Sequence, residues 1–221
     1  WLSLEEGDSS VPRFLAYLIA ALRTALPGVG ARSLALLRAE SVPSAEGLLA
    51  LLINEIAAQS VDEPPLILVL DDYHTIESVA VHHALAYLLE HLPPMMHLVV
   101  AARADPPLPL ARLRARGQLI EIRSSDLRFT PQETAALVAS VTRFDLSPDA
   151  VATLDARAEG WAAGLQMAAL SLQGRPREDL GEAIASFSGS SRHIADYMVD
   201  EVLSRQPAEI QAFLMRTAVL E

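Results

Sequence analysis

An unbroken aliphatic run, PPLILVLDD at residues 64–72, constrains the fold of this chain more than any other feature. A run of this length between turn-forming residues predicts a strand that is buried on both faces, as in the parallel sheet of an α/β protein. Open parallel sheets bind their ligands at the carboxyl ends of the strands. Asp71 and Asp72 end the run, as a magnesium-binding aspartate of a nucleoside triphosphatase would, but they could equally begin a polar loop or cap the next helix.

Strand and helix signals alternate over the first part of the chain. This alternation indicates βαβ units and a parallel sheet. The strands are predicted at 1–4, 66–71, 97–103 and 119–123, and the helices after Ser10, at about 45–59, at about 77–91 and around 108–116.

The pattern becomes entirely helical after residue 128. Thr130, Pro131 and Glu133 form a capping box with proline at the first helical position, and Ser147 with Pro148 repeats the start signal. Helices are predicted at about 131–141, 148–158, 162–173, 178–187, 192–204 and 207–216. The expected fold class is therefore α/β, followed by a helical bundle.

The sequence contains neither lysine nor cysteine, and all 17 basic residues are arginine. A P-loop needs a lysine that reaches the terminal phosphates, so residues 1–221 contain no such motif. The absence of cysteine excludes disulfides and thiolate sites. A net charge of −11 argues against a large nucleic-acid footprint in this segment. The longest apolar runs are too short to cross a bilayer, and we expect a soluble, cytoplasmic protein without membrane contact.

The six histidines do not suggest a metal site. His82 and His83 are neighbours on a predicted helix and face different directions, and no partner stands at chelating spacing from either. His74 follows the aspartates closely enough to reach their site, although a helix-capping or surface role would explain it as well. No G-x-S-x-G nucleophile motif is present.

Several long segments, in the same order, resemble the nucleotide-binding region of large MalT-like, LuxR-type transcriptional regulators. They are LVLDDYHTI, HLVVAARADPPLPLARLRARGQLIEIRSSDLRFTPQET, AEGWAAGLQMAALSL and ADYMVDEVLSRQPAEIQAFLMRTAVLE. WLSLEEGDSSVPRFLAYLIAALR resembles the stretch just after the P-loop helix of that family. The family belongs to the signal-transducing ATPases with numerous domains, and the resemblance runs from end to end.

The resemblance implies three domains and a fragment of a larger protein. Residues 1–128 would be the P-loop NTPase-like α/β domain without its first strand and P-loop, 129–188 a helical domain, and 189–221 the start of a winged helix. In the intact protein, effector-sensing repeats and a C-terminal helix-turn-helix that binds DNA would follow.

The resemblance also implies an ATP-dependent switch in a transcriptional activator. ATP and Mg²⁺ would bind between the α/β and helical domains, inducer would favour a self-associating state, and slow hydrolysis to ADP would reset it. Such a protein would be a weak ATPase, and this fragment alone is expected to be inactive. The alternative is a nucleotide-independent protein-interaction scaffold.

Three residues of the α/β part take site roles by this resemblance. Asp71 matches the magnesium aspartate. Adjacent residues of a strand point to opposite faces, so Asp72 cannot do the same job. The resemblance makes Asp72 the candidate to orient or activate the attacking water. Arg103 matches the sensor arginine that contacts the terminal phosphate, and its planar, always-charged fork suits phosphate oxygens. The alternative for Arg103 is an ordinary surface arginine after a strand.

Gly160 and Trp161 align with a Gly-Trp-Pro turn that in related proteins brings proline against the adenine. Here Ala162 replaces the proline, which puts the adenine contact at that position in doubt. Trp161 could instead anchor the core of the helical domain.

The resemblance places the missing P-loop strand between strands 97–103 and 119–123. Its removal would leave unpaired backbone groups on both sides of a gap. We therefore expect 119–123 to shift against 97–103, to be displaced or disordered, or to pair with another copy of the chain.

Overall fold

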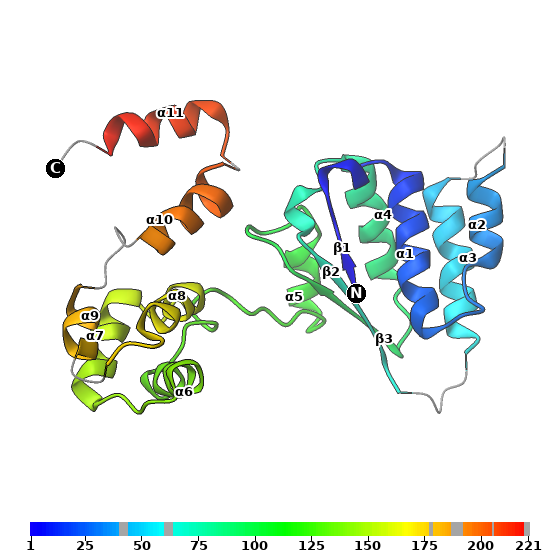
Figure 1. The fold of residues 1–221 in the computed structure, drawn as a ribbon. Coiled ribbons are helices and arrows are strands. Elements are labelled where there is room, and N and C mark those ends of the chain that lie inside the picture. Colours follow the sequence, from blue (N-terminus) through cyan, green and yellow to red (C-terminus); the bar gives the residue numbers. More distant parts are fainter. Residues whose placement is uncertain (40–43, 60–63, 177–178, 187–191, 205, 219–221) are drawn as a thin grey trace. The chain divides into compact units, whose positions relative to one another are not determined.

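The computed structural model describes residues 1–39, 44–59, 64–176, 179–186, 192–204 and 206–218. The chain, drawn in Figure 1, forms two compact units, Trp1–Leu119 and Ile120–Glu221. Each unit has its own hydrophobic core. We call them unit 1 and unit 2. The finer division into three domains at residues 128 and 188 stays a prediction.

Unit 1 is built on a three-stranded parallel sheet in the order β1-β2-β3, where β1 is Leu2–Ser3, β2 is Leu66–Asp71 and β3 is Met96–Val100. Leu70 of β2 pairs with Leu2 of β1, and Leu66 pairs with Met96 of β3. The aliphatic run thus forms the central strand. An α/β fold with a parallel sheet is confirmed.

Two helices of unit 1, α3 and α4, begin at a serine that caps the first turn. The hydroxyls of Ser44 and Ser78 accept the backbone N–H groups of Gly47 and Val81 at the first turns of α3 and α4. The helices are α1 (Val11–Ala25), α2 (Ala31–Leu37), α3 (Ala45–Ala57), α4 (Val79–Glu90) and α5 (Leu110–Ala115), with 3-10 turns η1 (Glu6–Asp8) and η2 (Tyr73–Thr75).

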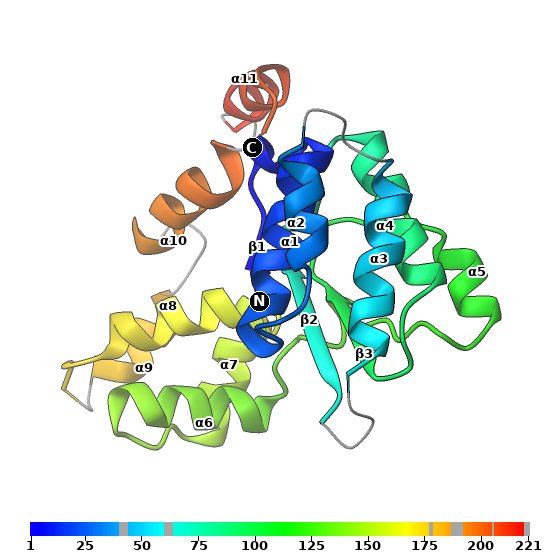
Figure 2. The same ribbon diagram turned by 90° about the vertical axis from the view of Figure 1, so that its right-hand side faces the viewer.

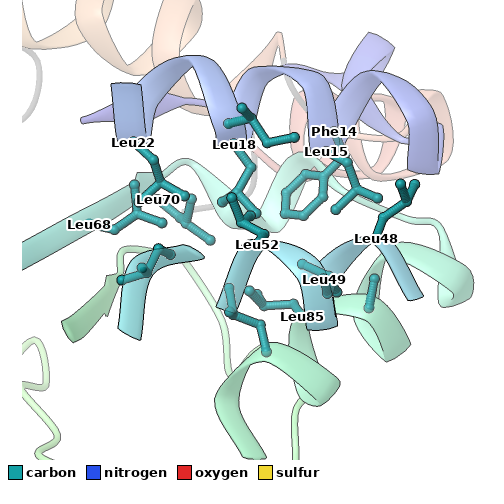
Figure 3. Packing of buried hydrophobic residues seen from close by; sticks show 14 of the residues in the cluster. Phe14, Leu15, Leu18, Leu22, Leu48, Leu49, Leu52, Leu68, Leu70 and Leu85 are labelled. Atoms are coloured by element: carbon teal, nitrogen blue, oxygen red, sulfur yellow. The ribbon is translucent and has the colours of Figure 1, made fainter. Parts of the chain in front are cut away.

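Helices α1, α3 and α4 contribute to the core on one face of the sheet (Figures 1 and 2). Leu18, Leu52 and Leu85 from these helices belong to the same buried cluster as Leu70 of the central strand (Figure 3). Full burial of one such side chain contributes about 2 kcal/mol. This packing holds the carboxyl end of β2 in a fixed position.

The opposite face of the sheet is largely open. Ile67 of β2 and Val99 of β3 are 58% and 46% exposed. His97 of β3, which lies opposite Ile67, is exposed as well. The expectation that strand 66–71 is buried on both faces is therefore wrong. An aliphatic run does not record whether a second layer covers the sheet, because both faces of such a strand are equally apolar.

Residues 119–123 do not form the predicted strand. They have no strand assignment, and Ile120 and Ile122 are 90% and 68% exposed. The sheet of the described residues contains β1, β2 and β3. The prediction of a strand here is wrong, while the expectation that the segment would not keep its place in the sheet is met. A segment with this alternating pattern forms a strand only when a neighbouring strand pairs with it.

Unit 2 is helical. Its core includes Val138, Leu154 and Leu165, which are fully buried. The predicted capping box is present, since the Thr130 hydroxyl accepts the Glu133 N–H and the Glu133 carboxylate accepts the Thr130 N–H. The elements are α6 (Pro131–Thr142), α7 (Pro148–Ala158), α8 (Ala162–Leu172), α9 (Leu180–Ser186), α10 (Arg192–Tyr197), the π-helical η4 (Met198–Leu203) and α11 (Ala208–Thr217).

Candidate functional site

Asp71 is the last residue of β2, at the carboxyl edge of the sheet. Its carbonyl oxygen accepts the Leu4 N–H at 3.1 Å, and one of its carboxylate oxygens accepts the Asp72 N–H at 3.0 Å. The residue is half-buried. Asp71 therefore stands where parallel sheets bind their ligands, as the sequence predicted.

Asp72 lies beyond the strand and adopts a left-handed backbone conformation, with φ 53° and ψ 35°. Aspartate tolerates this conformation better than most residues. The Thr75 N–H and hydroxyl both donate to the Asp72 carbonyl oxygen at 3.0 Å. Strand alternation was therefore the wrong reason to set Asp72 apart from Asp71: the left-handed turn, and not the pleat of a strand, determines where Asp72 points.

His74 lies at this turn. From the sequence, either a site role or a helix-capping or surface role could explain it. Its Nδ1 is 3.9 Å from Asp72 Oδ1. The Nδ1 atom is buried, and no hydrogen-bond partner for it exists among the described residues. The structure thus places a histidine beside the two aspartates.

Tyr73 anchors the turn in the core. Its side chain is 1% exposed, and its hydroxyl is 2.8 Å from Nδ1 of His82 on α4. Burial raises the pKa of the Tyr73 hydroxyl. Burial, and to a smaller extent the charge of His83, lowers the pKa of His82. Both groups are therefore neutral at pH 7. Sequence reasoning missed this pair, because its members are nine residues apart on different elements.

Arg103 follows the end of β3. The Ala101 N–H donates to the Leu70 carbonyl oxygen at 2.9 Å, and the Ala101 carbonyl oxygen accepts the Tyr73 N–H at 3.0 Å. The chain then bends, and Arg103 is exposed in this bend. Asp71, Asp72 and Arg103 are thus at the same edge of the sheet.

A short acidic loop after β1 borders the same edge. Asp8 is 3% exposed, and its carboxylate accepts Arg13 Nε at 2.8 Å and the Glu5 N–H at 3.0 Å. The Ser9 hydroxyl accepts the Glu77 N–H at 3.3 Å, which ties the loop to the segment that leaves β2. Sequence reasoning missed this loop, although Glu5 and Asp8 stand at the spacing of a capping box.

Gly160 and Trp161 lie in unit 2, at the start of α8. Gly160 has φ +69°, and its carbonyl oxygen accepts the Phe129 N–H at 2.8 Å. Trp161 is 37% exposed, so it is not a fully buried core anchor. Its ring lies over Gly164, where an added Cβ would come within 2.6 Å of the indole, and it makes an edge contact with Tyr197 at 5.8 Å.

The carboxylates at the sheet edge suit Mg²⁺ that is bound together with phosphates. Magnesium keeps several waters and takes one or two protein carboxylates plus phosphate oxygens. The half-buried Asp71 carboxylate is a group of this kind. Within the described ranges, no group of three or more histidine, aspartate or glutamate side chains could hold a metal ion by itself. Among these residues, no helix has the length and apolar character needed to cross a membrane.

Comparison with known proteins gives matches over the whole of this chain. The chain is 35% identical over 221 residues to the HTH-type transcriptional regulator MalT of Yersinia enterocolitica, and 37% identical over 222 and 221 residues to MalT of Serratia proteamaculans and of Klebsiella pneumoniae. All of the chain is covered, but it spans about a quarter, 24%, of the length of these relatives. No protein-family model matches the chain. The resemblance to part of the MalT-like regulators is therefore confirmed.

Proposed function

We propose that this chain acts as part of an ATP-dependent switch in a transcriptional activator. It matches about a quarter of the length of the MalT transcriptional regulators. The observation that carries the proposal is Asp71 at the carboxyl end of the central parallel strand, in a chain that matches these regulators over its whole length. ATP and ADP would be the alternative ligands of the switch.

Each site residue has a distinct proposed task at the sheet edge. Asp71 would bind Mg²⁺ with its carboxylate, and the Mg²⁺ ion would neutralise charge on the β- and γ-phosphates. Asp72 would orient the attacking water, the role that the resemblance to these regulators implies, and its exposure leaves it accessible to solvent. Arg103 would contact the terminal phosphate from the neighbouring strand end, where its guanidinium can make two parallel hydrogen bonds.

The phosphate cradle and the adenine contact need further groups. Residues 1–221 contain no lysine and no P-loop motif, so we propose that residues outside this chain supply the cradle. We propose that Gly160 and Trp161 contribute to the adenine contact. The partial exposure of Trp161 supports this assignment, because an exposed aromatic ring can stack on a base.

The wider behaviour of the switch is proposed by analogy with the regulators that the chain matches. We propose that residues 129–188 form the helical domain of the switch and that residues 189–221 begin a winged helix. Effector binding and DNA binding through a helix-turn-helix would reside in other domains. Inducer and ATP together would favour self-association, and hydrolysis would reverse it.

A second candidate function is a protein-interaction scaffold that needs no nucleotide. The open face of the sheet favours it, since Ile67 and Val99 on neighbouring strands are exposed apolar side chains. The two candidates differ in one simple respect, because only the switch requires ATP.

The proposal is tested on a longer protein that contains this chain and a P-loop. Calorimetry measures ATP binding with and without Mg²⁺, and phosphate release measures hydrolysis. Asp71→Asn removes one charge and little volume, and should lower magnesium-dependent binding or turnover by about tenfold or more. Asp145→Asn, at an exposed position of unit 2, is the matched control. Wild-type turnover in Asp71→Asn would show that the carboxylate is structural, and an absence of ATP binding would favour the scaffold.

A further inference from the structure

A buried hydrogen bond links the turn after β2 to helix α4. The Tyr73 hydroxyl and His82 Nδ1 are 2.8 Å apart, and the two rings are tilted by 59° with centroids 5.6 Å apart. Tyr73 is 1% exposed and His82 is 7% exposed. The pair joins the residue next to Asp72 to a helix that belongs to the core.

The bond is buried at both ends. One of the two groups donates its proton to the other, and which of them donates depends on the tautomer of the His82 ring. Removal of either partner leaves the other buried without a hydrogen bond, which costs more than the bond itself contributes.

The turn that this pair holds is conformationally costly. Asp72 occupies the left-handed region, and non-glycine residues stay there only when the surroundings determine the conformation. Two backbone hydrogen bonds contribute, from the Tyr73 N–H to Ala101 O and from the Thr75 N–H to Asp72 O. The Tyr73 side chain supplies the third restraint and connects the turn to α4.

We propose that His82 is a positioning residue that acts through the Tyr73 hydroxyl to fix the turn presenting Asp72 at the carboxyl edge of the sheet. The relevance of this turn to hydrolysis rests on the proposed function. The restraint itself rests on the geometry of Tyr73, His82 and Asp72 alone. Helix α4 and the candidate water-orienting carboxylate are thereby mechanically connected.

Native-state amide hydrogen exchange on the 221-residue chain tests this inference. Tyr73→Phe removes only the hydroxyl, and His82→Leu removes the ring nitrogen that pairs with it. In both variants the exchange rates of the Asp72, Tyr73 and Thr75 amides should rise about tenfold relative to those of the α1 and α3 amides. A tenfold rise is the change expected for the loss of one buried hydrogen bond. A purely structural role would accelerate all amides of unit 1 by the same factor.

Two further variants sharpen the test. His82→Asn places an amide oxygen close to the position of Nδ1 and should restore most of the protection at the turn. His83→Leu, at the exposed neighbouring position of the same helix, should leave the turn unchanged. Uniform acceleration across unit 1, or unchanged turn amides in Tyr73→Phe, would overturn the inference. Exchange needs no nucleotide, so this outcome is independent of the Asp71→Asn result in the longer protein.

Discussion

Asp71, the last residue of β2, lies opposite Ser3, the last residue of β1, in the parallel register of these strands. The two strands therefore end at the same level, and the loops that follow them leave the sheet side by side. Arg103 follows β3 at this edge too. The geometry collects two carboxylates and one arginine, but the backbone cradle that usually holds phosphates is not among these groups.

We predict that residues 1–221 alone bind ATP very weakly or not at all. In P-loop proteins the amide cradle and the lysine supply most of the phosphate contacts, and Asp71, Asp72 and Arg103 cannot replace them. Calorimetry with ATP and Mg²⁺ should give no measurable heat at micromolar concentrations. Micromolar affinity would mean that this chain contains a phosphate site of another kind.

Gly160→Ala should destabilise unit 2 by about 3 kcal/mol, which combines the strain of a left-handed alanine with a clash. The added Cβ would lie 2.7 Å from the Phe129 carbonyl oxygen, which belongs to the backbone and cannot easily move. Gly174→Ala is the matched control, because φ there is +77° and nothing lies within 4 Å of an added Cβ. It should cost about 1 kcal/mol. Urea unfolding monitored by Trp161 fluorescence, in a background where Trp1 is replaced by phenylalanine, measures both. Equal losses would contradict the close approach.

Unit 1 should lose stability as the solution becomes acidic, partly because of His82. The pKa of His82 is lowered in the folded chain. At pH values between the folded pKa and the unfolded pKa of about 6.5, the unfolded chain therefore binds more protons than the folded chain. The His82 contribution is therefore fully present above pH 6.5 and is lost as pH falls through the folded pKa. Urea unfolding from pH 8 to pH 5 should show a smaller pH dependence in His82→Asn than in wild type. An identical pH dependence would mean that His82 titrates normally.

The open face of the sheet should promote association of the isolated chain. Ile67→Lys places a charge on this face at a position that is already 58% exposed, so the fold should survive. Sedimentation velocity over a concentration series should show weaker association in Ile67→Lys than in wild type. Ile120→Lys, which adds the same charge at a 90% exposed position outside the strands, separates the effect of the face from that of net charge. Equal effects of both changes would remove the open face as the cause.

Local signals in the sequence were sufficient for most helices. Ser44, Ser78, Thr130 and Ser147 each accept a backbone N–H at the first turn of a helix, and the predicted boundaries lie within a few residues of those observed. Helix α2 was missed because it begins after Gly30 in a left-handed conformation, without a polar cap. The π-helical turn η4 was also missed, since its hydrogen-bonding pattern has no signature in the sequence.

Features that depend on partners far along the chain could not be predicted. Residues 119–123 have the composition of a strand, but strand formation requires a neighbour with unpaired backbone groups. The half-open sheet escaped prediction for a similar reason, because the pattern at Ile67 is the same with or without a covering layer. At the candidate site, the position of Asp71 followed from the strand pattern. The left-handed turn at Asp72 and the Tyr73–His82 pair did not, because they arise from tertiary packing.

The exposed segment from residue 120 to residue 128 makes the chain susceptible to endoproteases that cut after arginine. Arg123 and Arg128 are both exposed here, in backbone that belongs to no helix or strand. The core residues of unit 1 precede this segment and those of unit 2 follow it, so a cut would divide neither core. Brief digestion with trypsin should therefore cut the chain between Leu119 and Phe129 and leave two protected fragments. Each fragment could then be purified and studied as a separate folding unit.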